Sequence, residues 1–462
     1  MSLVPGDETL LQQQQAQLQL THLEKTETNW NEWVMDNGLR CLHIPLPKDD
    51  PRFQMTLLIG TGSRHEPAEL SGISHLLEHM LFRGSSKYPS FSDLSAAFES
   101  LGGEWNAATG HEYTEFYVNG TTARMDEAIE LFADFILRPA LSDLDTERRI
   151  VLRELEGELN ENGISTDPDF HIATKIWPNT SMAMPIIGTP ETLGKIASEN
   201  LRDWFNRWYA PNNAVICCVG GNYETIQNLL DNNFGVWKPQ KHVKQPPTQK
   251  TGFKGPCAFW VENSDNEYQI QISFVCDGTG SSNTAAYEML SRVLSDGFSS
   301  RLTKRIREEL GLVYDISSDV HQYDGSGLFN ISASVLGENI RPFFKEVFSV
   351  VKSLTKTQIP STELLRHKHR ALVDLDITTS EPAALAWRGS WAKISGTEAK
   401  LSVWAKRYSA LTAENLKETA LNLFTLKGLC VTALGPAEHN LQQELNQIVK
   451  ASWQEVDSAS TS

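Results

Sequence analysis

The chain has 462 residues, 40% of them hydrophobic and 21% charged. This length exceeds that of a domain built around a single hydrophobic core, so we predict more than one domain. Its 58 Asp and Glu outnumber its 41 Lys and Arg, and the resulting net charge of -17 argues against a nucleic-acid or anionic-membrane partner, because both attract basic surfaces. The apolar runs, such as residues 214–219, are far too short to span a bilayer.

The start of the chain and the cysteines bear on its compartment. Met1 to Asp7 lack the charged-then-apolar pattern of an export signal. Among six scattered cysteines, the adjacent Cys217 and Cys218 lie in an apolar strand whose side chains point to opposite faces, so we interpret the cysteines as buried free thiols. We therefore expect a cytoplasmic protein, or a periplasmic one if an export signal has been removed.

A Gln-rich segment precedes the first predicted domain. Residues 12–19 favour a solvated arm or an extra helix, and we assign residues 1–27 to this arm. Over residues 28–238, strand-like and helix-like runs alternate, as in an α/β or α+β layered domain. The predicted strands are Arg40–Ile44, Gln54–Gly60, Glu115–Gly120 and Ala214–Gly221, and the predicted helices are Ser74–Leu81, Ser92–Leu101, Met125–Leu137 and Asp145–Asn160.

The second half of the chain resembles a copy of the first. Residues 239–256 are rich in Lys, Gln and Pro without apolar periodicity, which predicts a linker. A strand, Gly60-Thr-Gly-Ser63 and a helix in the first half match a strand, Gly278-Thr-Gly-Ser281 and a helix in the second. Two such tetrapeptides also arise as coincidental turns, but the matching order and half lengths favour duplication, with a second domain over residues 257–455.

A helix with two histidines carries the strongest sign of chemistry. Ser74 is predicted to cap this helix, and the apolar residues around it hold it against a core. His75 and His79, four residues apart, project from one face and offer two nitrogen ligands to a single ion. Glu78 lies on the same face, where it suits a general base that stands near the metal without binding it.

Zinc catalysis needs a third protein ligand, and a Glu-rich helix near residues 145–158 supplies candidates. Glu147 and Glu154 are seven residues apart on one helical face, so one carboxylate can bind the metal while the other supports a histidine ring. Helical geometry alone does not show whether Glu147 or Glu154 binds the metal, and Glu156 and Glu158 are further candidates for the third ligand.

Two structural alternatives compete with the catalytic interpretation. A histidine pair on an amphipathic helix is often an ordinary surface or core feature, and a Glu-rich helix is usually a solvated face. A purely structural zinc site is the other alternative, but such sites usually close with four ligands and are rich in Cys. No cysteine lies near this motif.

At these residues the chain resembles the pitrilysin, insulinase and mitochondrial processing peptidase family of inverzincin metallopeptidases. His75-Leu-Leu-Glu-His79, followed by Met-Leu-Phe-Arg-Gly84, is similar to the family signature, and Glu154 follows His79 after 74 intervening residues, the family's spacing for its third ligand. The resemblance implies a short, two-domain, bacterial-type member in which Glu154 binds the metal and Glu147 is the supporting carboxylate. It also implies an α+β fold of two homologous domains in tandem, each a mainly antiparallel β-sheet covered by α-helices.

Two further segments resemble parts of the family that hold the substrate. Gly102-Gly-Glu-Trp-Asn-Ala107 is similar to an edge strand that pairs with the substrate backbone, so Asn106 and Ala107 are implied substrate contacts. In the second half, Arg307 and Tyr314 match an Arg and Tyr pair that grips the substrate near the metal, with the Tyr also steadying the oxyanion. Without the resemblance, Asn106 and Ala107 suit an ordinary tight turn and strand. Arg307 then suits a charge on a helix surface, and Tyr314 suits the core side of a strand.

The resemblance implies a zinc-dependent endopeptidase with one Zn²⁺ per chain. The substrates implied are peptides or unfolded polypeptide segments, enclosed in a chamber. Longer members carry four such domains, so a two-domain chain is expected to pair, as a homodimer or with a related chain that lacks the zinc motif. The alternative function is a non-catalytic peptide-binding or assembly subunit of a heteromeric peptidase.

Overall fold

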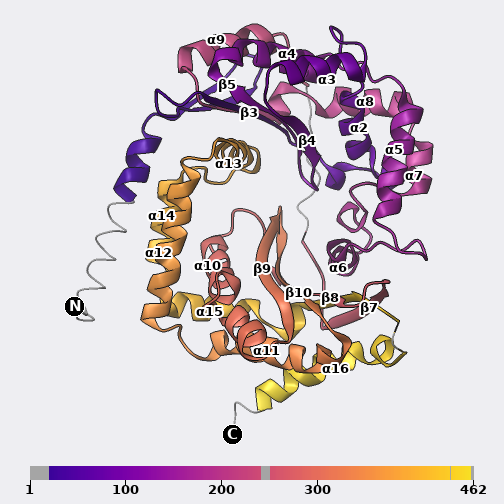
Figure 1. Ribbon diagram of the computed structural model, residues 1–462, viewed down its shortest axis with the longest axis vertical. Coiled ribbons are helices and arrows are strands. Elements are labelled where there is room, and N and C mark those ends of the chain that lie inside the picture. Colours follow the sequence, from indigo (N-terminus) through magenta and orange to yellow (C-terminus); the bar gives the residue numbers. More distant parts are fainter. Residues whose placement is uncertain (1–19, 241–249, 438, 459–462) are drawn as a thin grey trace.

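The protein consists of two halves, each a β-sheet with helices packed on it, that face each other across a central cleft (Figure 1). The computed structural model describes residues 20–240, 250–437 and 439–458. Residues 238–240 and 250–256 form neither helix nor strand, and the rest of the predicted linker lies outside the described residues. The α+β class expected from the sequence is confirmed.

The first sheet has six strands in the order β1-β2-β6-β3-β5-β4. All neighbours pair antiparallel except β2 and β6, and β4 lies at one edge. The strands are β1 (Asn31–Val34), β2 (Arg40–Ile44), β3 (Arg52–Ile59), β4 (Trp105–Thr109), β5 (Thr114–Thr121) and β6 (Ala214–Val219).

The second sheet repeats this topology with five strands in the order β7-β11-β8-β10-β9. Again one pair, β7 and β11, is parallel and the others are antiparallel. The repeated strand order confirms that the halves are homologous domains. The strands are β7 (Cys257–Glu262), β8 (Tyr268–Cys276), β9 (Val313–Tyr323), β10 (Ser326–Val335) and β11 (Leu429–Gly435).

Most helices of the first half cover one face of the first sheet, and their boundaries follow the apolar periodicity of the sequence (Figure 1). The helix predicted over Met125–Leu137 has these bounds in the structure, whereas the one predicted to reach Asn160 ends at Gly157. The helices are α2 (Ile73–Leu81), α3 (Phe91–Ser100), α4 (Met125–Leu137), α5 (Leu144–Gly157), α6 (Pro168–Ile176), α7 (Pro190–Lys195), α8 (Ser198–Trp208) and α9 (Tyr223–Phe234).

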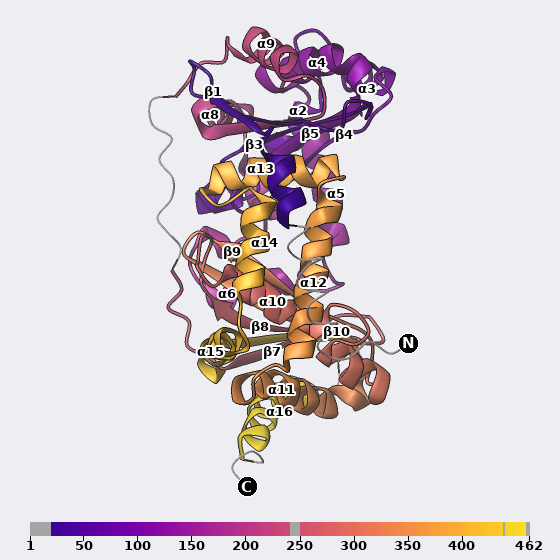
Figure 2. The ribbon, with the colours of Figure 1, turned by 90° about the vertical axis from the view of Figure 1, so that its left-hand side faces the viewer.

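The second half contributes both covering helices and a connection between the halves. Figure 2 shows α12 and α14 running between the second sheet and the first. No helix in the described ranges is long and apolar enough to cross a membrane. The helices are α10 (Thr284–Ser295), α11 (Ile340–Lys356), α12 (Ser361–Thr378), α13 (Pro382–Ser395), α14 (Leu401–Ala410), α15 (Ala413–Leu423) and α16 (His439–Ser458).

One helix of each half packs on the sheet of the other half. Helix α13 of the second half packs on β3 and β6 of the first sheet, so closely that a Cβ on Gly389 would lie 2.5 Å from Leu42 Cδ2 and 3.1 Å from Cys217 Sγ. Helix α6 of the first half packs on β11 and β8, with Ile172 in one apolar cluster with Cys430. The halves are therefore interlocked through their cores rather than joined by the linker alone.

The end of the predicted N-terminal arm belongs to the folded body. Residues 20–27 are helical, and Leu23 is fully buried in the larger apolar core. The Glu27 carboxylate accepts hydrogen bonds from the backbone N–H and the hydroxyl of Ser402 on α14. The arm assigned to residues 1–27 therefore includes a docked segment, while Gln12 to Gln19 lie outside the described residues.

Candidate metal centre

Helix α2 presents its polar residues away from the core that holds it. Ile73, Leu76, Leu77, Met80 and Leu81 are all fully buried in the core of the first half. Because these positions repeat with the helical period, His75, Glu78 and His79 are left on the opposite side, toward the central cleft.

The predicted cap of this helix is wrong. Helix α2 begins at Ile73, one residue before Ser74, and Gly72 is its N-cap residue. The carboxylate of buried Glu66 accepts hydrogen bonds from the N–H groups of Gly72 and Ser74, at 2.7 and 2.8 Å. A carboxylate at a helix N-terminus satisfies orphan donors and complements the helix dipole, which a single hydroxyl does less well.

Replacing Glu66 by Ala is expected to lower the free energy of unfolding by about 2–3 kcal/mol, because two buried N–H groups lose their acceptor. Urea denaturation followed by circular dichroism measures this change. Glu69→Ala, on the exposed neighbouring turn, is the matched control and should shift the free energy of unfolding by less than about 0.5 kcal/mol. Equal stability of the two variants would show that Glu66 does not hold the helix.

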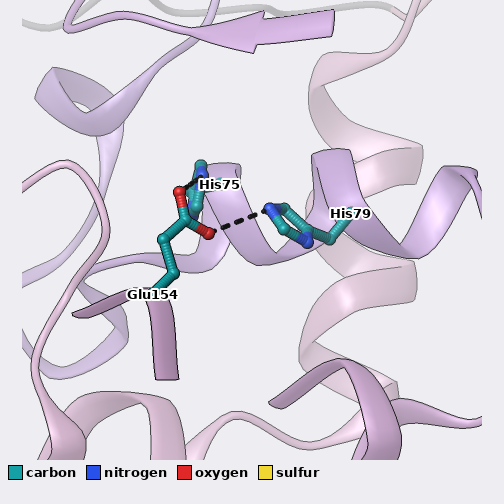
Figure 3. A group of neighbouring side chains, drawn as sticks. All are labelled: His75, His79 and Glu154. Carbon is teal, nitrogen blue, oxygen red and sulfur yellow. Dashed lines mark ion pairs between the residues drawn. The ribbon is translucent and has the colours of Figure 1, made fainter. Parts of the chain in front are cut away.

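Three side chains from α2 and α5 converge at one point (Figure 3). One ligand atom from each of His75, His79 and Glu154 lies within 4.8 Å of the other two. The two Nε2 atoms lie 3.8 and 3.5 Å from the Glu154 carboxylate oxygens. Ligands of a tetrahedral zinc at ~2.1 Å are separated by about 3.4 Å, so this donor set fits one ion.

Glu154 is the carboxylate of α5 that faces both histidine Nε2 atoms, whereas Glu147 contacts His79 at Nδ1. In the described residues, His75, His79 and Glu154 are the only set of His, Cys, Asp or Glu with metal-ligand spacing. Glu156 and Glu158, which compete on sequence grounds alone, are exposed and outside it. The geometry therefore favours Glu154 as the third ligand.

Burial and neighbouring charges set the protonation of the two histidines differently. Burial and, to a smaller extent, the charge of His79 together lower the pKa of His75 to about 3, so this ring is a neutral donor. Burial also opposes protonation of His79, but the hydrogen bond with Glu147 and the charges of Glu78 and Glu154 raise its pKa overall. A metal ion would take the place of that proton among the carboxylates.

Glu147, the supporting carboxylate that the resemblance implies, lies behind His79. Its carboxylate lies 3.2 Å from His79 Nδ1, which leaves Nε2 directed at Glu154. The other oxygen of Glu147 accepts a hydrogen bond of 3.2 Å from Arg83, whose guanidinium also binds Asp143 at 2.6 Å. This chain of contacts orients the ring in the way that outer carboxylates orient metal-binding histidines.

Thr109 on β4 holds the carboxylate of Glu78, and sequence analysis missed it. The Thr109 hydroxyl donates a 2.6 Å hydrogen bond to Glu78 Oε2. Burial raises the pKa of Glu78, and this hydrogen bond partly offsets the shift. The available signal was the period of the strand, since Thr109 follows Ala107 by two residues and shares its face.

The edge strand β4 offers its unpaired side to a ligand. Among the described strands it pairs with β5 alone. Ala107 lines the cleft, whereas Asn106 is exposed and its side-chain oxygen accepts a hydrogen bond from the N–H of Ala107. An extended peptide could pair with this edge, and the alternation of the strand places Ala107 rather than Asn106 toward the metal group.

The cleft between the halves has a volume of about 1840 Å³ and is lined by both of them. It contains His75, Glu78, His79 and Glu154. Its lining is strongly acidic, because Arg388 and Arg407 are the only Arg or Lys side chains that the described part of the chain contributes to it. The further carboxylates of the lining are Glu112, Glu158, Asp167, Asp169, Glu288, Glu398 and Glu418.

The turn between β9 and β10 closes one side of this cleft. Arg64 of the first half is almost fully buried, binds Glu112, and lies 3.1 Å from the Asp324 carboxylate in that turn. The neighbouring Tyr323 ring makes an edge contact with His111. The hairpin of the second half is therefore fastened to the first half at the lining of the cleft.

Arg307 and Tyr314 lie outside the cleft of their own chain. Their side chains contact each other, with the guanidinium 5.5 Å from the ring centroid, and Tyr314 is 83% exposed. Tyr323, which reaches the cleft, ends the same strand β9 nine residues later. At ~3.3 Å per residue, the pair stands about 30 Å farther along that strand. One chain does not bring these residues to its own metal group.

Comparison with known proteins places this arrangement in a family. Residues 47–189 match the family described as Insulinase (Peptidase family M16), and residues 195–371 match the Peptidase M16 inactive domain. The chain is 26% identical over 378 residues to a Bacillus subtilis protein named uncharacterized zinc protease YmxG, covering 79% of this chain and 89% of the relative.

Two solved structures share the fold. A protease from Helicobacter pylori has a TM-score of 0.81 at 19% identity, over 88% of this chain and 99% of the other. A peptidase M16 inactive domain from Pseudomonas fluorescens has a TM-score of 0.78 at 18% identity, over 89% and 98%. With the tandem sheets and the sequence matches taken together, the chain belongs to the pitrilysin and insulinase family, peptidase family M16.

Proposed function

We propose that the chain is a zinc-dependent endopeptidase. The observation that carries this proposal is the convergence of His75, His79 and Glu154, with the carboxylate of Glu78 beside them and a cleft in front. A structural zinc site would close with a fourth protein ligand, and the described residues offer only three. Three ligands and an adjacent base are what hydrolysis requires.

The residues around the site have separable roles in this proposal. Zinc, when bound, supplies a Lewis acid that polarises the scissile carbonyl and makes water more acidic. Glu78 takes a proton from the attacking water and returns it to the leaving amine. Thr109 keeps the Glu78 carboxylate in place, and Glu147 fixes the ring of His79.

The cleft favours extended substrates. A peptide that pairs with the free edge of β4 would run past Ala107 and Thr109 and so past Glu78. Because both halves enclose this path, peptides and unfolded segments should enter and stable folded proteins should not. Rapid digestion of a stable folded protein would oppose this restriction.

Digestion of a peptide library, analysed by mass spectrometry with and without a chelator, tests the function directly. We expect internal cleavage that is lost with the chelator and restored by added Zn²⁺. Cleavage only at chain ends would exclude an endopeptidase, and chelator-resistant cleavage would exclude the metal mechanism.

We infer further that two chains pair as a homodimer. The metal group and the Arg307 and Tyr314 pair belong to one polypeptide but lie far apart in it, so a second copy can bring its pair to the first copy's site. Phe298, 73% exposed and 5.5 Å from the Arg307 guanidinium, extends the apolar surface there. A related chain without the zinc motif is the alternative partner, and light scattering on a gel-filtered sample distinguishes monomer from pair.

Mixing two inactive variants is expected to restore activity if the sites are shared. One chain carries Glu78→Gln, and the other carries Arg307→Ala with Tyr314→Ala. After random exchange at equal amounts, half of the dimers are mixed and each has one intact site, which predicts about a quarter of wild-type activity. The unmixed variants are the controls. Absence of recovery in a sample shown to contain mixed dimers would contradict sharing.

A non-catalytic peptide-binding or assembly subunit is the alternative function. It is favoured by the similarity to a structure named as an inactive domain and opposed by the complete donor set of α2 and α5. Metal analysis of the purified protein discriminates between them. About one zinc per chain supports the peptidase, and none supports the scaffold.

A further inference from the structure

Three aromatic side chains form a wall of the cleft that the hydrolytic residues do not use. Trp387 and Trp391, one turn apart on α13, have ring centroids 5.9 Å apart and planes inclined by only 19°. Tyr113 meets them edge-on, at 6.2 and 5.5 Å. All three line the cleft and are only partly buried, so their faces remain accessible.

This aromatic wall adjoins the residue that holds Glu78. The Tyr113 ring packs over Gly110, where a Cβ would lie only 2.8 Å from a ring carbon. Gly110 directly follows Thr109, the donor to Glu78, and its N–H bonds to the carbonyl of Tyr113 in the same turn. The Tyr113 ring therefore packs over a residue that is next to Thr109 in the chain, ~4 Å away, and Thr109 is the residue that holds Glu78.

A carboxylate without a partner stands next to the wall. Glu115 follows Tyr113 by two residues and lies directly opposite Ala108 of β4, which lines the cleft, so its side chain projects from the same face of the sheet as that of Ala108. Within the described residues, no hydrogen-bond donor or cation is paired with its carboxylate. Burial raises the pKa of Glu115 to about 7, and its charge contributes to raising the pKa of Tyr113, which places the two groups in one electrostatic environment.

We propose that Tyr113, Trp387, Trp391 and Glu115 form a subsite for the cationic side chain, Lys or Arg, of a bound peptide near the bond to be cleaved. This proposal rests on the proposed peptidase function and adds a preference to it. The cation would lie against the aromatic faces and pair with the Glu115 carboxylate.

The chemistry of the four residues favours a cation over an apolar side chain. Aromatic faces attract Lys and Arg, most strongly where water is excluded. An apolar occupant would further desolvate the partnerless Glu115 carboxylate and give it no compensating contact, which is unfavourable. The acidic lining of the cleft adds long-range attraction for the same kind of ligand.

Peptide binding to a full-length chain carrying Glu78→Gln tests the subsite without requiring cleavage. The probes are ten-residue peptides with a neutral fluorophore that differ only in one central residue, which is Arg, norleucine or Phe. By fluorescence anisotropy we expect the Arg peptide to bind about 10-fold more tightly than the norleucine peptide. Adding Glu115→Gln should bring the Arg and norleucine peptides within about 2-fold of each other, and Trp391→Leu should also weaken Arg binding.

Glu99→Gln is the matched control, since it removes the same charge from an exposed position on α3 and should leave the Arg preference intact. Thermal melting verifies that each variant is folded. Tightest binding of the Phe or norleucine peptide, or an Arg preference that survives Glu115→Gln, would overturn the subsite. A chain that binds Arg peptides as expected but whose wild-type form cleaves none would refute the peptidase function and leave the subsite standing.

Discussion

Glu78→Gln is expected to lower kcat for peptide cleavage by about 10³-fold or more while zinc remains bound. The amide keeps the shape of the side chain and can still interact with the Thr109 hydroxyl, but it cannot accept the proton of the attacking water. The metal donors His75, His79 and Glu154 are unchanged, so the zinc content of the purified variant should equal that of the wild type.

The measurement pairs steady-state cleavage of a quenched fluorescent peptide with elemental analysis of zinc. Glu156→Gln makes the same chemical change on the exposed side of α5, outside the metal group, and should keep both activity and zinc. If Glu78→Gln retained substantial turnover, another group would have to be the base. If it lost zinc as well, its role would be to hold the site rather than to transfer a proton.

Local sequence patterns predicted the parts of this site that a single element determines. The spacing of His75 and His79 places both rings on one side of α2 because the helix repeats every 3.6 residues, and the apolar residues between them lie in the core. Strand and helix boundaries such as Arg40–Ile44 and Met125–Leu137 were likewise predictable from periodicity.

Contacts between elements were not predictable in this way. Glu66 caps α2 from a preceding turn, and Thr109 reaches Glu78 from a strand 31 positions later in the chain. Strand periodicity places Thr109 on the same face as Ala107, but neither its contact with Glu78 nor the contact of Glu66 with α2 follows from such a pattern, because each depends on how the elements pack in three dimensions. The choice of Glu154 over Glu156 also needed the position of α5 against α2, which spacing on one helix does not define.

Helices α6 and α13, each of which packs on the sheet of the other half, show most clearly that contacts between elements were not predictable. Neither helix was among those predicted from the sequence, and a helical pattern alone would not show which sheet a helix covers. Since α13 packs on the first sheet, it brings Trp387 and Trp391 of the second half to Tyr113 of the first. The division of the sequence into domains at residues 239–256 therefore does not divide the cleft, whose walls come from both halves.

Glu154→Ala is expected to reduce the zinc content from about one per chain to near zero, with complete loss of cleavage. Glu154 supplies both carboxylate oxygens that face the histidines, so its removal leaves two donors of the three. Glu147→Gln is the informative comparison, because it removes only the acceptor behind His79. Loss of such an outer carboxylate typically weakens metal binding by about 10–100-fold, and loss of a ligand should weaken it more.

Competition with a chelating dye measures the three zinc affinities in parallel, with Glu156→Ala as the matched control on the same helix. The expected order of zinc affinity is wild type and Glu156→Ala, then Glu147→Gln, then Glu154→Ala. Because Glu154 is 45% exposed, its replacement should leave the fold intact, and thermal melting without metal checks this. Wild-type zinc affinity in a folded Glu154→Ala variant would exclude this carboxylate as the third ligand, and with it the metal site inferred from α2 and α5.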